Sequence, residues 1–321
     1  MATAPPSKTQ PSKIQQLRDL APQPEAQSAY AATLLNAKLG QEAVLAALQV
    51  LQKRTFPQAR PALLALYGYY TTHETRDPAA FTRAAILHAL RHVVQPTDTA
   101  FLAQATATYV FPPPSFKEEG AALRSAALLA LNEVDDTLAR YHAVRLLANE
   151  HTDPMSGEPA LTAVRLLGAQ EEVLPLYFYV MQAGARTYPE VVSESLRYLT
   201  TIPDTLIPGL LERFATTPSS LTLVGLFDLL LNHRTGPHAL DFIAGFLRDT
   251  LQFDVYRYLV TTLVASGRAQ FVTELMRLAN LERRREKISV LFDALALLPP
   301  SPEITTLLDQ LNQRLTQTQS G

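Results

Sequence analysis

The densest group of charged side chains is the basic run Arg283-Arg284-Arg285-Glu286-Lys287. Converging cations of this kind could contact a phosphate or an acidic partner, because Lys and Arg supply the charge that such ligands need. The run lies at the expected start of a helix, where the helix dipole disfavours positive charge. The alternative is an exposed turn whose cations pair with the neighbouring Glu282 and Glu286.

A second group follows from aligning three predicted helices on Leu87, Val164 and Leu196. The alignment places His88, Arg165 and Arg197 at one equivalent position, which forms a sparse basic row if it faces the inner side of a helical stack. Tyrosines suit protein recognition because they are rigid and amphipathic, and three lie near the same expected surface: Tyr198, Tyr256 and Tyr258. The alternative is that the arginine stems cover neighbouring helices while their charged groups stay in water.

Metal chemistry is not expected. His88 and His92 are four residues apart on a predicted helix, which is metal-ligand spacing. The helical zinc motif needs a Glu after the first His, and Ala89 stands there. The alternative is that both histidines are ordinary polar residues of a helix face. The sequence also lacks cysteine, which excludes disulfides, thiolate metal sites and a cysteine nucleophile.

No catalytic or cofactor-binding residue is expected either. The chain has no Gly-rich phosphate loop, no Gly-x-Ser-x-Gly turn and no paired-carboxylate motif. Acidic pairs at Asp135-Asp136 and Glu171-Glu172 open predicted helices, where they match the helix dipole without a catalytic role.

Charge and hydropathy restrict the class of partner. The net charge is −2, and residues 1–160 hold 14 of the 28 basic and 14 of the 30 acidic groups, so neither half is strongly charged. This balance gives no general attraction to nucleic acid or anionic lipid. The first residues have no apolar signal segment, and the most apolar run, 221–231, is too short to cross a bilayer. We therefore expect a cytoplasmic protein without a membrane partner.

A repeated apolar motif predicts the helices that would position these residues. A pattern like Leu-x-x-Leu, followed by a polar or proline-rich turn, recurs at intervals of 30 to 41 residues. A period of this kind is typical of stacked helical hairpins. The copies begin at Leu48, Leu87, Leu128, Val164, Leu196, Leu226 and Leu259, with a weaker copy at Leu291. We expect the leucines among them to be buried between helices, in particular Leu87, Leu128, Leu196 and Leu226.

Prolines at regular intervals bound helices of about 12 to 18 residues, since proline breaks a helix interior. The pattern predicts eight pairs of helices and a closing helix. First helices are expected near 26–38, 57–71, 97–110, 135–150, 170–184, 203–216, 236–249 and 268–280. Second helices are expected near 41–53, 78–93, 116–133, 155–168, 188–201, 218–233, 252–266 and 284–298, with the closing helix near 302–316.

Three domains of unequal size follow from this pattern. Residues 1–25 are rich in Pro, Gln and Ser and are expected to be a disordered tail. Residues 26–316 form the repeat region. Residues 317–321 are polar and are expected to fray.

The chain resembles HEAT-repeat proteins, including the bacterial HEAT-like group. Three first helices carry an interior proline followed by an apolar run, at Pro61, Pro175 and Pro208, where the first helices of HEAT repeats are known for a proline kink. Two second helices carry Arg-x-small-small-apolar patterns beginning at Arg83 and Arg124. The resemblance covers residues 26–316. It implies a right-handed α-solenoid of about eight HEAT-like helix pairs.

The resemblance implies a non-enzymatic scaffold that binds another protein on the concave face. Some HEAT-repeat proteins are di-iron enzymes with several His-Glu pairs, but this chain has one such pair, His73-Glu74, in a predicted loop. The alternative function is a HEAT-like nucleic-acid binder or DNA glycosylase that uses the Arg cluster, although Trp is absent and the charge is balanced. We therefore expect a protein partner and not a nucleic acid.

Overall fold

The computed structural model describes residues 12–182, 188–234 and 239–317. These residues form eighteen α-helices joined by loops and short 3₁₀ turns, and the described part of the chain contains no strand. The predicted all-α class is confirmed. Each expected helix of the repeat region overlaps a helix of the structure, because apolar periodicity and prolines are local signals.

The chain divides into two compact units, Met1–Leu166 and Leu167–Gly321, and the division falls inside α9 (Ala160–Ala169). In the first unit, second helices α3, α5 and α7 contact one another in chain order, and first helix α6 contacts α8. Helices that follow one another in the chain also pack together as pairs, as α4 does with α5 and α6 does with α7. The helices of this unit are α1 (Lys13–Asp19), α2 (Pro24–Thr33), α3 (Gln41–Leu51), α4 (Arg60–Thr72), α5 (Phe81–Leu90), α6 (Thr99–Thr106), α7 (Ala121–Asn132) and α8 (Asp136–Leu147).

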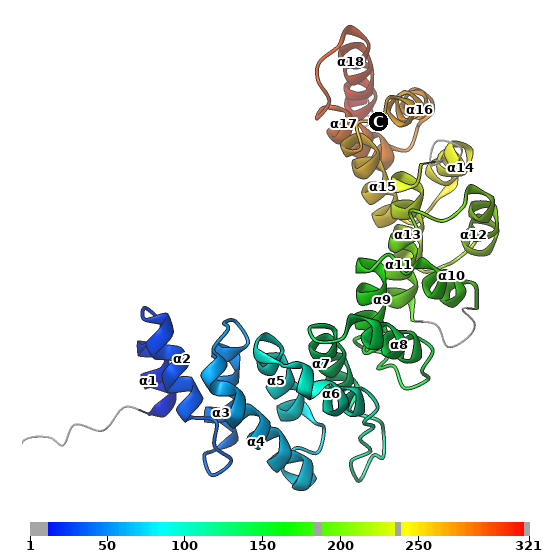
Figure 1. Ribbon diagram of the computed structural model, residues 1–321. Helices are drawn as coiled ribbons and strands as arrows, with labels where there is room; N and C mark the ends of the chain where they lie inside the picture. Colours follow the sequence, from blue (N-terminus) through cyan, green and yellow to red (C-terminus); the bar gives the residue numbers. More distant parts are fainter. Residues whose placement is uncertain (1–11, 183–187, 235–238, 318–321) are drawn as a thin grey trace, which may run out of the picture. The chain divides into compact units, whose positions relative to one another are not determined.

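The second unit repeats this order of contacts. Figure 1 shows α11, α13, α15 and α17 following one another in one row, with α10, α12, α14 and α16 beside them, and α18 contacts both α16 and α17. The helices are α10 (Val173–Gln182), α11 (Pro189–Tyr198), α12 (Ile207–Phe214), α13 (Ser220–Asn232), α14 (Leu240–Asp249), α15 (Phe253–Ala265), α16 (Ala269–Leu281), α17 (Arg285–Leu295) and α18 (Pro302–Gln317).

The residues of the repeated apolar motif form the core. The predicted burial of Leu87, Leu128, Leu196 and Leu226 is confirmed, because each is 0% exposed. The register derived from the sequence therefore holds along the second helices. The first residue of every copy is at most 1% exposed: Leu48, Leu87, Leu128, Val164, Leu196, Leu226, Leu259 and Leu291.

The prolines of the first helices lie in the first helical turn. Pro61 and Pro208 are the second residues of α4 and α12, and each follows a 3₁₀ turn directly. Pro175 is the third residue of α10. Proline has no N–H to donate, and the first turn has no intrahelical acceptor for that group, so proline is tolerated there. These residues mark helix starts and do not interrupt a helix.

The fold begins earlier than the sequence indicated. Helix α1 lies inside the segment 1–25 that was expected to be a disordered tail, and it packs on α2 and α3. Leu17 is 3% exposed, and the Gln27 side-chain amide donates a 2.9 Å hydrogen bond to its carbonyl oxygen. The buried Leu17 side chain and this hydrogen bond therefore help to hold the short helix against its neighbours. The remaining tail residues, 1–11, and the terminal residues 318–321 lie outside the described residues.

None of the described helices combines the length and the apolar character that crossing a membrane requires.

Candidate functional site

A row of polar side chains joins three successive second helices of the second unit. Arg197 of α11 donates from Nε to Asp228 Oδ2 of α13 at 2.7 Å, and from Nη1 to Glu194 Oε2 at 3.1 Å. The hydroxyl of Tyr258 in α15 donates to the other oxygen of Asp228. We call Glu194, Arg197, Asp228 and Tyr258 the polar row.

The polar row is held in one arrangement. Burial and the hydrogen bond to the Asp228 carboxylate raise the pKa of Tyr258, so its hydroxyl stays a donor at neutral pH. Arg197 is exposed, but two carboxylates occupy its guanidinium. The predicted residues Arg197 and Tyr258 therefore do lie on one surface, and their side chains are already oriented.

The other two predicted tyrosines are mainly packing residues. Tyr256 is only 2% exposed, and its expected place on the binding surface is wrong. Tyr256 and Tyr258 are two residues apart on α15, so their side chains point in different directions. Tyr198 is half-buried, and its ring covers Gly168, where an added Cβ would lie 2.2 Å from the ring.

The basic run at residues 283–287 does not act as one cluster. Lys287 is 4% exposed, so its prediction as a partner-binding residue is wrong. Arg284 donates to both carboxylate oxygens of Glu282 at 3.0 Å and also to a backbone carbonyl of α14. Arg283 and Arg285 are exposed. The run therefore has two exposed cations without a carboxylate partner in the described residues, where the sequence indicated four.

The burial of Lys287 has a structural cause. Its Nζ donates to the carbonyl oxygens of Leu247 at 2.5 Å and Arg248 at 3.3 Å, in the last turn of α14, and lies 4.6 Å from the centroid of the Tyr256 ring. The last carbonyls of a helix have no intrahelical partner and carry partial negative charge. Lys287 satisfies two of them although it lies 40 and 39 residues further along the chain.

Lys287 shares its position in the repeat with Arg83 and Arg124, since each lies four residues before the repeated apolar residue of its helix. Arg83 is 1% exposed and donates from Nε to Asp77 at 3.2 Å. The same carboxylate accepts from the first backbone amides of α5, at Thr82 and Arg83. The resemblance to HEAT proteins points to Arg83 and Arg124, whereas the sequence predicts the third residue, Lys287, to be a surface cation.

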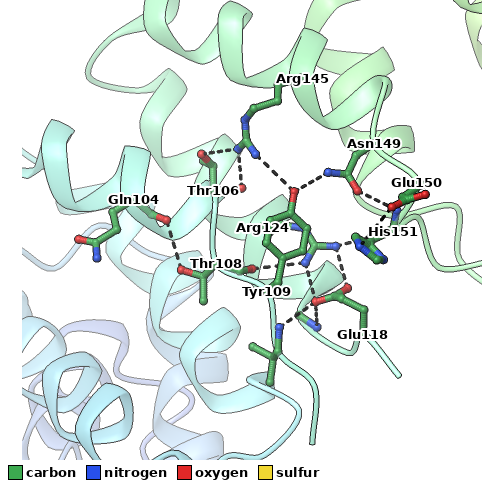
Figure 2. A network of polar contacts seen from close by, with 12 residues as sticks. Gln104, Thr106, Thr108, Tyr109, Glu118, Arg124, Arg145, Asn149, Glu150 and His151 are labelled. Atoms are coloured by element: carbon green, nitrogen blue, oxygen red, sulfur yellow. Dashed lines mark hydrogen bonds and ion pairs between the residues drawn. The ribbon is translucent and has the colours of Figure 1, made fainter. Parts of the chain in front are cut away.

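Arg124 is the centre of the most extensive of these arrangements (Figure 2). The side chain is fully buried and donates to both oxygens of Glu118, at 2.6 and 2.8 Å, and to the carbonyl oxygens of Thr108 and His151. The guanidinium carbon lies 4.5 Å from the centroid of the Tyr109 ring. Burial alone would raise the pKa of Glu118, but the hydrogen bonds from Arg124 and two backbone amides hold it below its ordinary value. This network fastens the loops 107–120 and 148–159 to α7.

A groove of about 810 Å³ lies between the exposed sides of α15 and α17. One wall consists of Phe253, Arg257 and Thr261, which are spaced four residues apart on α15. The facing wall comes from one side of α17 and continues to the second residue after its end: Arg285, Glu286, Ser289, Val290, Asp293, Ala294 and Leu297. We call this feature the α15–α17 groove.

The charged residues of the groove are not neutralised internally. Arg285, Glu286 and Asp293 make no ion pair with any side chain in the described ranges, and Arg257 contacts the Phe253 ring at 5.2 Å without a carboxylate partner there. Sequence reasoning named Arg285 but missed Arg257 and Asp293. A sequence pattern could have identified them, because both are polar residues on the exposed face of a helix whose other faces are apolar.

The remaining predicted residues lie in the first unit. Arg165 is exposed on α9, and His88 is half-buried on α5. His92 lies beyond the end of α5, in a 3₁₀ turn, and its Nε2 lies 2.8 Å from the carbonyl oxygen of Gln52. Arg165 and Arg197 belong to different units, so the expected basic row is not one described surface. Among the described residues, no three His, Cys, Asp or Glu side chains gather as a metal site would require.

The chain matches no protein-family model, no curated protein and no solved structure.

Proposed function

We propose that the chain is a binding scaffold of the HEAT-like α-solenoid kind, which holds another protein on the exposed side of its second helices. The observation that carries the proposal is the α15–α17 groove, whose charged side chains have no internal partner in the described part of the chain. Charges left unpaired beside apolar surface are available to a second protein.

Long-range polar contacts support a repeating architecture. Arg197 reaches Asp228 across 31 residues, and Lys287 reaches Leu247 across 40. In the first unit, Arg145 reaches the carbonyl of Thr106 across 39. These separations equal about one repeat, so each of these three contacts fastens one pair of helices to the next. A stack built in this way presents a preformed surface, which reduces the entropy lost on binding.

The polar row supports the same surface. Arg197 and Tyr258 are fixed by Asp228 before any partner arrives, so their side-chain entropy is already lost. A partner that contacts α11, α13 and α15 therefore meets oriented donors and acceptors.

The proposal is tested with a partner recovered by affinity purification and then produced separately, so that direct binding is measured by calorimetry. Thr261→Arg introduces a long cation into the α15–α17 groove and is expected to weaken binding at least tenfold. Thr273→Arg makes the same change on an exposed position of α16, a first helix, and is expected to change the affinity by less than twofold.

Two outcomes would overturn the proposal. One is that no recovered protein binds the purified chain directly. The other is that Thr273→Arg weakens binding as much as Thr261→Arg, because binding would then not depend on the second helices.

A further inference from the structure

We infer that the α15–α17 groove binds a bipolar segment of a partner protein, with a carboxylate at one end, an apolar middle and a cation at the other end. The inference rests on the proposed function and specifies the chemistry of the partner. Its basis is that unpaired charges of opposite sign lie at different positions along the length of the groove, beside apolar side chains.

The end of the groove near the start of α17 favours a carboxylate. Arg257 and Arg285 come from its two walls, and neither has an acidic partner among the described residues. The neighbouring Glu286 offsets one of the two charges and leaves this end positive. A guanidinium group binds a carboxylate through two parallel hydrogen bonds, so Arg is well suited to this ligand.

Several other arginines of the second unit pair with carboxylates. Arg248 pairs with Asp249 at 3.1 Å, and Arg277 pairs with Glu274 at 2.5 Å. Arg284 pairs with Glu282. In the groove, by contrast, the guanidinium of Arg257 stacks beside the Phe253 ring, which orients it without neutralising it.

The opposite end favours a cation. Asp293 lies eight residues after Arg285 on α17, a distance of about 12 Å at the rise of an α-helix. No basic side chain pairs with Asp293 in the described ranges. A partner segment therefore needs its acidic and basic groups about 12 Å apart, which corresponds to about eight residues of helix or four of an extended strand.

Apolar side chains line the same wall. Val290 and Ala294 lie four residues apart on α17 and therefore on the same side of the helix. Leu297, which is 75% exposed, extends the apolar surface just past the helix. An aliphatic side chain of the partner between its two charged groups would cover this surface. Nucleic acid fits the groove less well, because Glu286 and Asp293 would repel its phosphates.

The experiment selects twelve-residue peptides from a displayed random library on the full-length chain and measures the enriched sequences by fluorescence anisotropy. We expect peptides with an acidic and a basic residue flanking an aliphatic one. The double variant Arg257→Glu/Arg285→Glu and the single variant Asp293→Lys should each weaken binding at least tenfold. Arg283→Glu, which changes an exposed cation outside the groove, should alter the affinity by less than twofold.

A charge exchange gives the sharpest result. A peptide whose acidic residue is replaced by Lys should bind the Arg257→Glu/Arg285→Glu chain better than the wild-type chain. The inference is wrong if no sequence is enriched, if the enriched peptides carry one sign of charge only, or if the groove variants bind them normally. A natural partner that is lost with Thr261→Arg but retained with all three charge changes would keep the proposed function and reject only this chemistry.

Discussion

At the scale of the residue, burial distinguishes cations that stabilise the fold from cations that can meet a partner. Arg83, Arg124 and Lys287 are buried and donate hydrogen bonds to carboxylates or backbone carbonyls of the same unit. Arg257 and Arg285 are exposed and have no such partner among the described residues. Charge alone therefore does not identify the binding surface.

We expect Arg124→Ala to lower the free energy of unfolding by about 3–5 kcal/mol, because it leaves the Glu118 carboxylate buried without its cation. Arg234→Ala is the control, since Arg234 forms an exposed ion pair with Asp204 and should cost less than about 1 kcal/mol. Urea unfolding at pH 7 measures both. Equal losses in the two variants would contradict a structural role for the buried pair.

Lys287 predicts a pH dependence of stability. Burial lowers its pKa to about 8 from an ordinary 10.5. At pH values between these two pKa values, Lys287 holds a proton in the unfolded chain and has released it in the folded chain. The free energy of unfolding therefore rises with pH, by no more than about 1.4 kcal/mol per pH unit. The free energy of unfolding of the wild type minus that of Lys287→Met should therefore increase from pH 7.5 to pH 9.5. A constant or falling difference would show that the lysine is not desolvated.

At the scale of the element, close helix packing depends on one glycine. Gly225 of α13 lies against the backbone of Ser193 in α11, and an added Cβ would meet the Ser193 carbonyl oxygen at 2.5 Å. Backbone atoms cannot move aside as a flexible side chain can. The approach of these two helices, which the polar row bridges on the exposed side, therefore requires glycine at this position.

Gly225→Ala should destabilise the chain by roughly 1–3 kcal/mol through overpacking and should also disturb the polar row. Gly245→Ala is the matched control in α14, where nothing closer than 3.9 Å would meet the new methyl group. It should raise stability by about 0.5–1 kcal/mol, because alanine is a better helix former than glycine. Thermal unfolding of both variants tests the packing, and a stabilised Gly225→Ala protein would refute it.

At the scale of the whole molecule, the distribution of charge gives little attraction to nucleic acid. The net charge is −2, and the one dense basic run loses Lys287 to the interior and Arg284 to Glu282. Duplex DNA is bound mainly through several cations that converge on its phosphates. The described surface of this run supplies two exposed arginines.

The chain is therefore expected not to bind random duplex DNA appreciably at 150 mM salt. Fluorescence anisotropy between 50 and 200 mM salt is the measurement, since a protein with 6–10 phosphate contacts loses about 10³–10⁵ in affinity over that range. Micromolar binding at 150 mM that is weakened by Arg283→Glu/Arg285→Glu would favour the nucleic-acid alternative over the scaffold.

Local patterns in the sequence determined the helical class, the positions of the paired helices and the buried leucines. Amphipathic periodicity and proline act within a few residues, so Leu196 and Leu226 could be assigned to the core without knowing their partners. The family resemblance and the handedness of the stack stay predictions.

Tertiary structure alone decided which charged residues form the surface. Lys287 and Arg285 are two residues apart in one basic run, yet the first reaches carbonyls of α14 and the second lines the α15–α17 groove. The difference depends on the rotation of α17 and on what α14 and α15 place beside it. Such contacts join residues one repeat apart, and their geometry is set when the helices pack, which no local pattern encodes.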